Sequence, residues 1–331
     1  MTLCVALRAM RIIALCLLTF AALISAGEAP LTIAVIPKGT THEFWKAVHA
    51  GAVKAQREAQ AAGRTVNLIW RGPTREDDRT SQIDVVQGFI GQRVSGIVLA
   101  PLDSKALVAP INLASAAKIP VVIIDSALES KKPVGFVATD NRAAGRLAGE
   151  RAVTLLSGKG RVLVLRYAVG SASTTEREEG FLEALKAAKD ISVVSSDQYA
   201  GATMATALTA SETLLNRFAG QIDAVFTPNE SSTAGMAKAI KDRKLTTLKH
   251  VGFDASAPLI DGLRAGEVHG LVVQDPFTMG YLGVKNLLAH LAGTKIEAKI
   301  DTPAKLVTTE NMAEKEFAEL LAPPLAEFLG K

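Results

Sequence analysis

Residues 31–63 read LTIAVIPKGTTHEFWKAVHAGAVKAQREAQAAG, a short β-branched run followed by a turn and a long alanine-rich segment. The run at 31–36 is typical of a buried strand, because its apolar residues are nearly continuous. From residue 44 to residue 63 apolar residues recur at three-to-four spacing, which predicts a helix that covers one face of a sheet. Strands that alternate with such helices form βαβ units, so this stretch predicts an α/β fold with a parallel sheet.

The same alternation continues along the chain and gives ten candidate strands. They are predicted at 31–36, 66–70, 95–100, 120–125, 134–139, 161–166, 191–196, 223–228, 248–253 and 270–275. Two sets of five strands imply two similar Rossmann-like lobes, each with a parallel sheet flanked by helices such as the one predicted at 175–189.

The chain is expected to cross between the two lobes three times, near 139–140, near 274–275 and near 301–303. Three crossings form a three-strand hinge that can bend with few changes in backbone angles. The predicted lobes are residues 27–138 with 275–302 at the N-terminal side, and residues 139–274 with 303–331 at the C-terminal side.

Length and composition set limits on the function. The chain has 331 residues, of which 48% are hydrophobic, so it can bury a large core and is expected to form two domains. Its 37 Lys and Arg and 33 Asp and Glu give a net charge of +4 that is spread along the sequence. Nucleic-acid binding requires a basic stripe, and we therefore expect no nucleic-acid partner.

The first 26 residues have the pattern of a cleaved secretory signal. Arg8 and Arg11 precede an apolar run at 12–24, and small residues follow it. The run is short for a membrane span, so we expect a signal peptide at 1–26 and a periplasmic protein, with an uncleaved anchor as the alternative. Met10 is a second possible start. Cys4 and Cys16 both lie in this segment, so the mature chain is expected to contain no disulfide.

Polar side chains follow nearly every predicted strand. In open α/β sheets ligands bind beyond the carboxyl ends of the strands, so two lobes facing each other would form one polar cleft. A single glycine, Gly39, follows the first strand. The glycine patterns of dinucleotide and P-loop sites are absent there, so a phosphate cradle is not expected. Asp and Asn are also common helix caps, which leaves each residue an alternative structural role.

The residue types expected in the cleft suit a sugar. Asp125, Asp254 and Arg177 would each be costly to bury without partners, and vicinal hydroxyl groups supply bidentate hydrogen bonds. The rings of Phe44 and Trp45 match the C–H faces of a sugar, and we expect at least one of them in the cleft. Thr40 and Glu43 have the spacing of a capping box, which predicts a structural role for Glu43.

Motifs in a fixed order resemble one known family over nearly the whole mature chain. They include TIAVIPK, SGIVLAPLDSKAL, IPVVIIDS, VATDNRAAG, EREEGF, VFTPNESSTAGMAKAI, HVGFDAS and GLVVQDPFTMGYLGV. They resemble the periplasmic sugar-binding proteins of ABC importers, in the type I, ribose-binding-like branch. The resemblance implies a monosaccharide or polyol ligand and an ABC permease partner, and we expect a monomer without a cofactor, a metal or catalytic residues. Ligand residues of that family match Lys38, His42, Phe44, Trp45, Asp125, Arg177, Asn229, Asp254 and Gln274.

Three departures from the ribose-binding pattern put ribose itself in doubt. Ser126 stands where the ribose binders have arginine, Ala100 where they have asparagine, and Lys38 where they have serine. We expect the Lys38 ammonium to lie in the cleft and replace the missing cation, with a solvated lysine as the alternative. Tyr199 is the one nearby candidate for an aromatic wall in the second lobe.

Three other functions are alternatives to transport. Asp125 and Asp254 could form a glycosidase pair, but the scattered histidines suggest neither a triad nor a metal site. A transcriptional regulator with this two-lobed core would need a helix-turn-helix where the signal peptide stands. A sugar sensor for a chemoreceptor or histidine kinase stays open, because transport and sensing both use the closed form.

Overall fold

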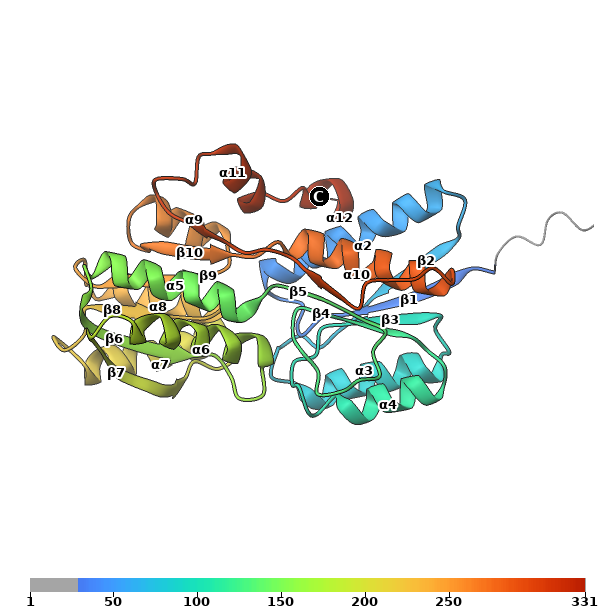
Figure 1. Cartoon of the computed structure of the whole chain (residues 1–331), viewed down its shortest axis with the longest axis horizontal. Coiled ribbons are helices and arrows are strands. Elements are labelled where there is room, and N and C mark those ends of the chain that lie inside the picture. The colour runs from blue at the N-terminus through green and yellow to red at the C-terminus, as the bar shows by residue number, and fades with distance from the viewer. Residues whose placement is uncertain (1–28, 331) are drawn as a thin grey trace, which may run out of the picture.

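The structure is a computed structural model that describes residues 29–330. The predicted signal peptide at 1–26 lies outside the described residues. Two α/β lobes lie side by side along the long axis of the molecule (Figure 1). Each lobe has one sheet with helices on both faces, so the predicted fold class is confirmed.

The two sheets have the same strand order. The first has the order β11-β5-β4-β3-β1-β2 and the second β12-β10-β9-β8-β6-β7. The first consists of β1 (Leu31–Ile36), β2 (Val66–Trp70), β3 (Gly96–Leu99), β4 (Val121–Ile124), β5 (Gly135–Ala138) and β11 (Lys299–Asp301). The second consists of β6 (Lys159–Arg166), β7 (Asp190–Tyr199), β8 (Ala224–Phe226), β9 (Lys249–Phe253), β10 (Gly270–Val273) and β12 (Lys305–Val307).

All ten predicted strands are present, with ends that differ by a few residues at most. The edge strands β11 and β12 were not predicted, because each has only three residues. The first sheet is parallel throughout, and in the second only β12 runs antiparallel, beside β10. Strand order reverses beside β1 in one lobe and beside β6 in the other, and these reversal points are where ligands bind in such sheets.

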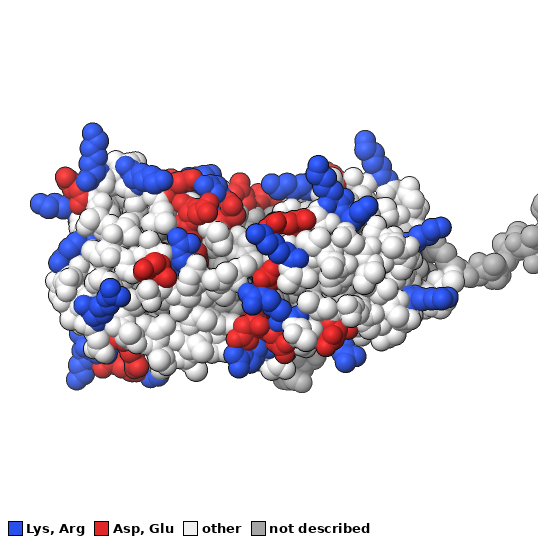
Figure 2. Space-filling view, turned by 90° about the horizontal axis from the view of Figure 1, so that it is seen from below, with Lys and Arg blue, Asp and Glu red and all other residues white. Residues whose placement is uncertain are grey.

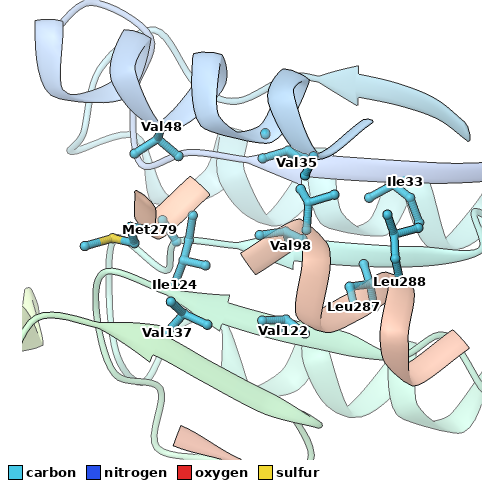
Figure 3. Close-up of a cluster of buried hydrophobic side chains, with 14 of the residues drawn as sticks. Ile33, Val35, Val48, Val98, Val122, Ile124, Val137, Met279, Leu287 and Leu288 are labelled. Carbon is cyan, nitrogen blue, oxygen red and sulfur yellow. The ribbon is translucent and has the colours of Figure 1, made fainter. Parts of the chain in front are cut away.

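Helices cover both faces of the first sheet. They are α2 (Glu43–Ala61) and α10 (Pro276–Leu291) on one face, and α3 (Arg79–Gly91) and α4 (Val108–Ala116) on the other. Figure 3 shows Val48 of α2 and Met279 of α10 packed with strand residues such as Ile124. Burial of these continuous apolar strands on both faces provides the main driving force for folding of the lobe.

The second lobe repeats this arrangement. Its helices are α5 (Asn141–Leu155) and α6 (Ala172–Lys186) on one face, α7 (Met204–Arg217) and α8 (Glu230–Asp242) on the other, and α9 (Ala257–Arg264) near β10. Glycines allow the helix pairs to approach closely. A Cβ added to Gly51 of α2 would lie 1.9 Å from the Phe277 carbonyl oxygen, and one added to Gly145 of α5 would lie 2.1 Å from the Arg177 carbonyl oxygen.

The chain passes from the first sheet to the second after β5, returns after β10, and passes again between β11 and β12. Helix α11 (Lys315–Leu321) then packs on the second lobe with Leu259. Helix α12 (Leu325–Leu329) lies against α2 of the first lobe (Figure 1), where Arg57 donates to the Phe328 carbonyl oxygen at 3.0 Å. The prediction that placed all of 303–331 in the C-terminal lobe is therefore wrong for α12, because Arg57 of α2 binds its carbonyl oxygens and lies over the Phe328 ring.

Basic and acidic side chains are interspersed on the face of the molecule shown in Figure 2. Within residues 29–330, no helix has the length and apolar character needed to cross a membrane.

Candidate functional site

A small pocket lies between the two lobes, at the carboxyl ends of their strands, and the side chains that meet across it leave only about 30 Å³ of free space. Its lining residues are Lys38, His42, Phe44, Trp45, Glu76, Asp125, Tyr167, Ser173, Thr174, Arg177, Asn229, Glu230, Asp254 and Gln274. All nine residues predicted for the site are among them, so the structure brings the whole predicted set together.

Lys38 and Asp125 form a buried ion pair on the first-lobe side. Lys38 follows β1, and its Nζ lies 2.6 Å from Asp125 Oδ2 and donates to Ser173 Oγ of the other lobe at 3.0 Å. Lys38 is only 4% exposed, so the alternative of a solvated lysine does not hold. Ser126 Oγ accepts from the Ser173 backbone N–H at 3.1 Å, so the position that would carry an arginine in the ribose pattern instead links the two lobes.

Arg177 reaches the pocket from α6 and is 2% exposed. Its Nε donates to Asn141 Oδ1 at 2.8 Å and its Nη1 to the Pro228 carbonyl oxygen at 2.9 Å. Its guanidinium lies over the Phe253 ring at 4.7 Å. These contacts hold the guanidinium plane in one orientation. The buried Nη2 has no hydrogen-bond partner among the described residues and is available to an acceptor in the pocket.

Asp254 and Gln274 form the adjoining wall. Gln274 Nε2 donates to Asp254 Oδ1 at 2.7 Å, and the buried Gln274 Oε1 has no partner within residues 29–330. Asp254 Oδ2 accepts from the Glu230 backbone N–H at 2.9 Å and lies 4.0 Å from Arg177 Nη1. Burial raises the pKa of Asp254, and the Arg177 charge opposes this shift. The wall therefore offers both hydrogen-bond donors and hydrogen-bond acceptors to a ligand.

Glu76 is a member of the pocket that the sequence analysis missed. Its carboxylate contacts His42 Nδ1 at 2.6 Å and accepts from Trp45 Nε1 at 2.6 Å and from the Tyr167 hydroxyl at 2.7 Å. It therefore orients three rings, one of which belongs to the second lobe. Glu76 lies in the loop after β2, several residues beyond the strand. A search for polar residues directly after strands could therefore not find it.

The Glu76 and His42 charges stabilise each other. Burial alone would raise the pKa of Glu76, but the His42 charge and hydrogen bond lower it. Burial alone would lower the pKa of His42, but the Glu76 charge and hydrogen bond raise it to about 9. At neutral pH the pair is therefore an imidazolium and a carboxylate.

Aromatic side chains enclose the pocket from both lobes. Phe44 and Trp45 both line it, with their rings edge to face at a centroid distance of 4.9 Å. In the second lobe the aromatic wall is Tyr167, which is 2% exposed. The expectation for Tyr199 is wrong, since its side chain is 45% exposed on the edge strand β7 and does not line the pocket. Tyr167 directly follows β6, at the carboxyl edge of the sheet where ligands bind in such folds.

The predicted capping box at the start of α2 is wrong. The N-cap residue is His42, and its side chain makes no capping hydrogen bond. The N–H groups of Glu43 and Phe44 instead donate to Glu230 Oε1 at 3.3 Å and Oε2 at 3.1 Å. Burial raises the pKa of Glu230 to about 7.

Asn229 carries a cap of its own. It is the N-cap of α8, where its Oδ1 accepts from the Ser232 backbone N–H at 3.2 Å and its Nδ2 donates to Ser231 Oγ at 3.1 Å. Its amide therefore lines the pocket while it is held by its own helix. A ligand contact at this position stays a prediction.

Chemically, the pocket combines carboxylates, a guanidinium and an ammonium with ring faces. Such a set can bind a small polyhydroxylated molecule, whose hydroxyl groups hydrogen bond with the charged groups while its C–H faces contact the rings. Within residues 29–330, no group of three His, Cys, Asp or Glu side chains is placed to hold a metal ion.

Comparison with known proteins gives a consistent set of relatives. A family model described as a periplasmic binding protein domain matches residues 33–295. The D-ribose/D-allose-binding protein of Pseudomonas aeruginosa is 31% identical over 289 residues, which cover 83% of this chain and 88% of that protein.

Solved structures of sugar-binding proteins are also similar to this chain. A carbohydrate transporter solute-binding protein from Agrobacterium radiobacter, in complex with D-arabinose, is 34% identical with a TM-score of 0.82, and the match covers 89% of this chain and 99% of that one. An ABC transporter solute-binding protein from Agrobacterium vitis with bound D-fucose is 34% identical with a TM-score of 0.83, over 88% of this chain and 100% of that one.

Proposed function

The chain belongs to the periplasmic binding protein family, and from this premise we propose that it captures an uncharged monosaccharide or polyol between its lobes and delivers it to an ABC permease. Two of the relatives described above are solute-binding proteins of transporters, and the third is a sugar-binding protein. This agrees with the prediction that the chain is not an enzyme. We further propose that the mature protein is a periplasmic monomer released from a cleaved signal peptide.

The charge balance of the pocket carries the proposal. Each cationic side chain lies beside a carboxylate: Lys38 Nζ is 2.6 Å from Asp125, His42 Nδ1 is 2.6 Å from Glu76, and Arg177 Nη1 is 4.0 Å from Asp254. An anionic ligand would enter this pocket without a free cation, and a buried unpaired charge is costly. The one carboxylate outside these pairs, Glu230, already accepts from two backbone N–H groups of α2. A polyhydroxylated ligand adds no charge and can hydrogen bond with both members of each pair.

The proposed ligand contacts are the nine predicted residues together with Tyr167. The free Arg177 Nη2 and Gln274 Oε1 are a donor and an acceptor that suit one hydroxyl group or two vicinal ones. Phe44 and Trp45 contribute an apolar wall. The sugars bound to the two structural relatives, D-arabinose and D-fucose, support a ligand of this class.

The proposed mechanism is closure of the two lobes around the ligand. The lobes contact each other across the pocket through hydrogen bonds such as those from the Tyr167 hydroxyl to Glu76 and from Lys38 to Ser173, so the described form is closed. A ligand that touches both lobes stabilises this form by its additional contacts, and only such differential binding can shift the equilibrium. The three crossings of the chain would bend as the hinge.

Ligand screening tests the proposal. Thermal shift measurements over pentoses, hexoses, deoxysugars and polyols should find at least one that raises the melting temperature, since ligand at 100 times its dissociation constant stabilises by about 2.7 kcal/mol. Calorimetry should then give a one-to-one complex with that sugar. Tight binding of an amino acid or a sugar phosphate, with no response to any sugar, would contradict the proposal.

Transport and sensing can be separated in cells. Deletion of the gene should abolish uptake of the labelled ligand, and expression of the full chain should restore it. Normal uptake accompanied by a lost chemotactic or transcriptional response would favour the alternative of a sugar sensor.

A further inference from the structure

Helix α2 depends on the opposite lobe for its N-terminal cap. The first N–H groups of a helix have no partner within the helix and need an outside acceptor. In α2 the N-cap side chain of His42 does not supply one. Both Glu230 carboxylate oxygens do, by accepting from the Glu43 and Phe44 N–H groups. Glu230 belongs to α8 of the second lobe, so this cap exists only while the lobes are together.

Glu230 is itself held firmly in the second lobe. It is the first residue of α8, follows the N-cap residue Asn229, and donates its backbone N–H to Asp254 Oδ2 at 2.9 Å. Its side chain is nearly buried, with a residue exposure of 9%. The carboxyl group is thus presented at a fixed place from which it can reach α2.

The capped turn carries the ligand wall of the first lobe. His42 precedes α2, and Phe44 and Trp45 lie in its first turn, and all three line the pocket. An uncapped first turn frays, and fraying here would displace the rings that face the ligand. Glu76 of the same lobe holds His42 and Trp45, so the Phe44 ring is the one whose position depends on closure of the lobes.

We propose that Glu230 is a positioning residue that caps α2 across the cleft only in the closed form, and so couples lobe closure to placement of Phe44 on the ligand. This inference takes the sugar ligand from the proposed function and therefore rests on it. It adds to the binding site a residue that acts on the ligand through α2. It requires both carboxylate oxygens as acceptors, which the ionised form of Glu230 supplies. The neighbouring charged groups that face its carboxyl group are His42 and Asp254.

The effect is measured in ligand dissociation. Experiments at pH 8 keep Glu230 largely ionised, because its pKa is about 7. Glu230→Ala removes both acceptors and should raise the dissociation rate of the sugar found by screening by roughly 3- to 30-fold, the range expected for loss of a helix cap. Glu230→Gln keeps one acceptor oxygen and should give an intermediate rate. The association rate should change little.

A matched control removes a cap that lies within one lobe. Thr203 caps α7, where its Oγ1 accepts from the Thr206 N–H at 3.1 Å, away from the pocket. Thr203→Ala should lower the melting temperature of the ligand-free protein and leave the dissociation rate unchanged. Glu230→Ala should raise the dissociation rate and leave the melting temperature of the ligand-free protein unchanged. An unchanged dissociation rate in Glu230→Ala, or equal rates for Glu230→Gln and Glu230→Ala, would overturn the proposal.

A measurement without ligand keeps this test separate from that of the proposed function. Cys4 and Cys16 lie in the predicted signal peptide, so Lys131→Cys and Lys189→Cys can place one fluorescent label on an exposed site of each lobe. Energy transfer should report fewer closed molecules in Glu230→Ala than in the labelled parent, even if no sugar binds. Identical transfer efficiencies in the two proteins would overturn the coupling, whatever the ligand is.

Discussion

Asp125 and Asp254 occupy equivalent positions in the two lobes. Each follows the fourth strand of its lobe, with left-handed φ values of 63° and 66°. Each also donates its backbone N–H to the next strand, to the Val137 carbonyl oxygen at 3.0 Å and to the Val272 carbonyl oxygen at 2.9 Å. Left-handed backbone is uncommon outside glycine, and Asp tolerates it better than most residues. The repeated lobe thus aims one carboxylate into the pocket from each side.

The first prediction concerns Asp125. Asp125→Ala leaves the buried Lys38 ammonium without its carboxylate in the closed form. We expect sugar binding to weaken by about 2–5 kcal/mol, the usual cost of truncating a buried charged hydrogen-bond partner. Stability of the ligand-free protein should change little, because the open cleft lets water reach the group. Calorimetry measures the loss, and Asp77→Ala, which removes an exposed partner of Arg75, is the control that should leave affinity unchanged.

The second prediction concerns Lys38 and specificity. Lys38→Ser restores the residue of the ribose pattern but leaves Asp125 without its buried cation. The affinity for the identified sugar should fall by roughly tenfold or more, since a charged hydrogen bond contributes about 1.5–3 kcal/mol. Lys46→Ser on the exposed side of α2 serves as the control. A change of less than twofold in Lys38→Ser would mean that the lysine does not determine specificity.

The third prediction is a pH dependence of stability. The Glu76 carboxylate raises the pKa of His42 from 6.5 to about 9, so folding favours the protonated imidazole. The stabilisation is fully present below pH 6.5 and is lost as the pH rises through 9, with a slope of at most about 1.4 kcal/mol per pH unit. Urea unfolding should therefore show a difference in free energy between the parent and His42→Gln at pH 6 that shrinks at pH 9.

Glu76→Gln provides an independent check of the same pair. NMR titration should find the His42 pKa lower in Glu76→Gln than in the parent protein, because the neighbouring charge is gone. If the two titration curves coincide, the Glu76 charge is not the cause of the shift.

The fourth prediction concerns the glycine contact behind Arg177. In Gly145→Ala the new Cβ would lie 2.1 Å from the Arg177 carbonyl oxygen, so α5 and α6 must separate. We expect a loss of stability of about 1–3 kcal/mol, typical of overpacking, and weaker ligand binding because Arg177 moves with α6. Gly88→Ala in α3 is a matched control: its Cβ meets nothing within 4 Å, so it should stabilise α3 by up to about 1 kcal/mol. Equal effects of both substitutions would contradict this explanation.

The two lobes and the ten main strands could be predicted from local sequence patterns, and the nine residues that line the pocket from the resemblance of their motifs to a known family. A run of β-branched residues at 31–36 or 121–124 has to be buried on both faces, and the carboxyl ends of parallel strands meet at one edge. Residues such as Asp125 and Asp254 could therefore be placed from their position after a strand.

The partners that pocket residues meet depend on the tertiary fold. Glu76 lies in a loop and gains its role by reaching three rings from two lobes, Glu230 caps a helix far away in sequence, and α12 returns to the first lobe to pack on α2. Each of these contacts depends on the distance between segments that are remote in the chain. Sequence patterns report the burial and backbone preference of a residue and its near neighbours, whereas such distances are set by packing of the whole fold.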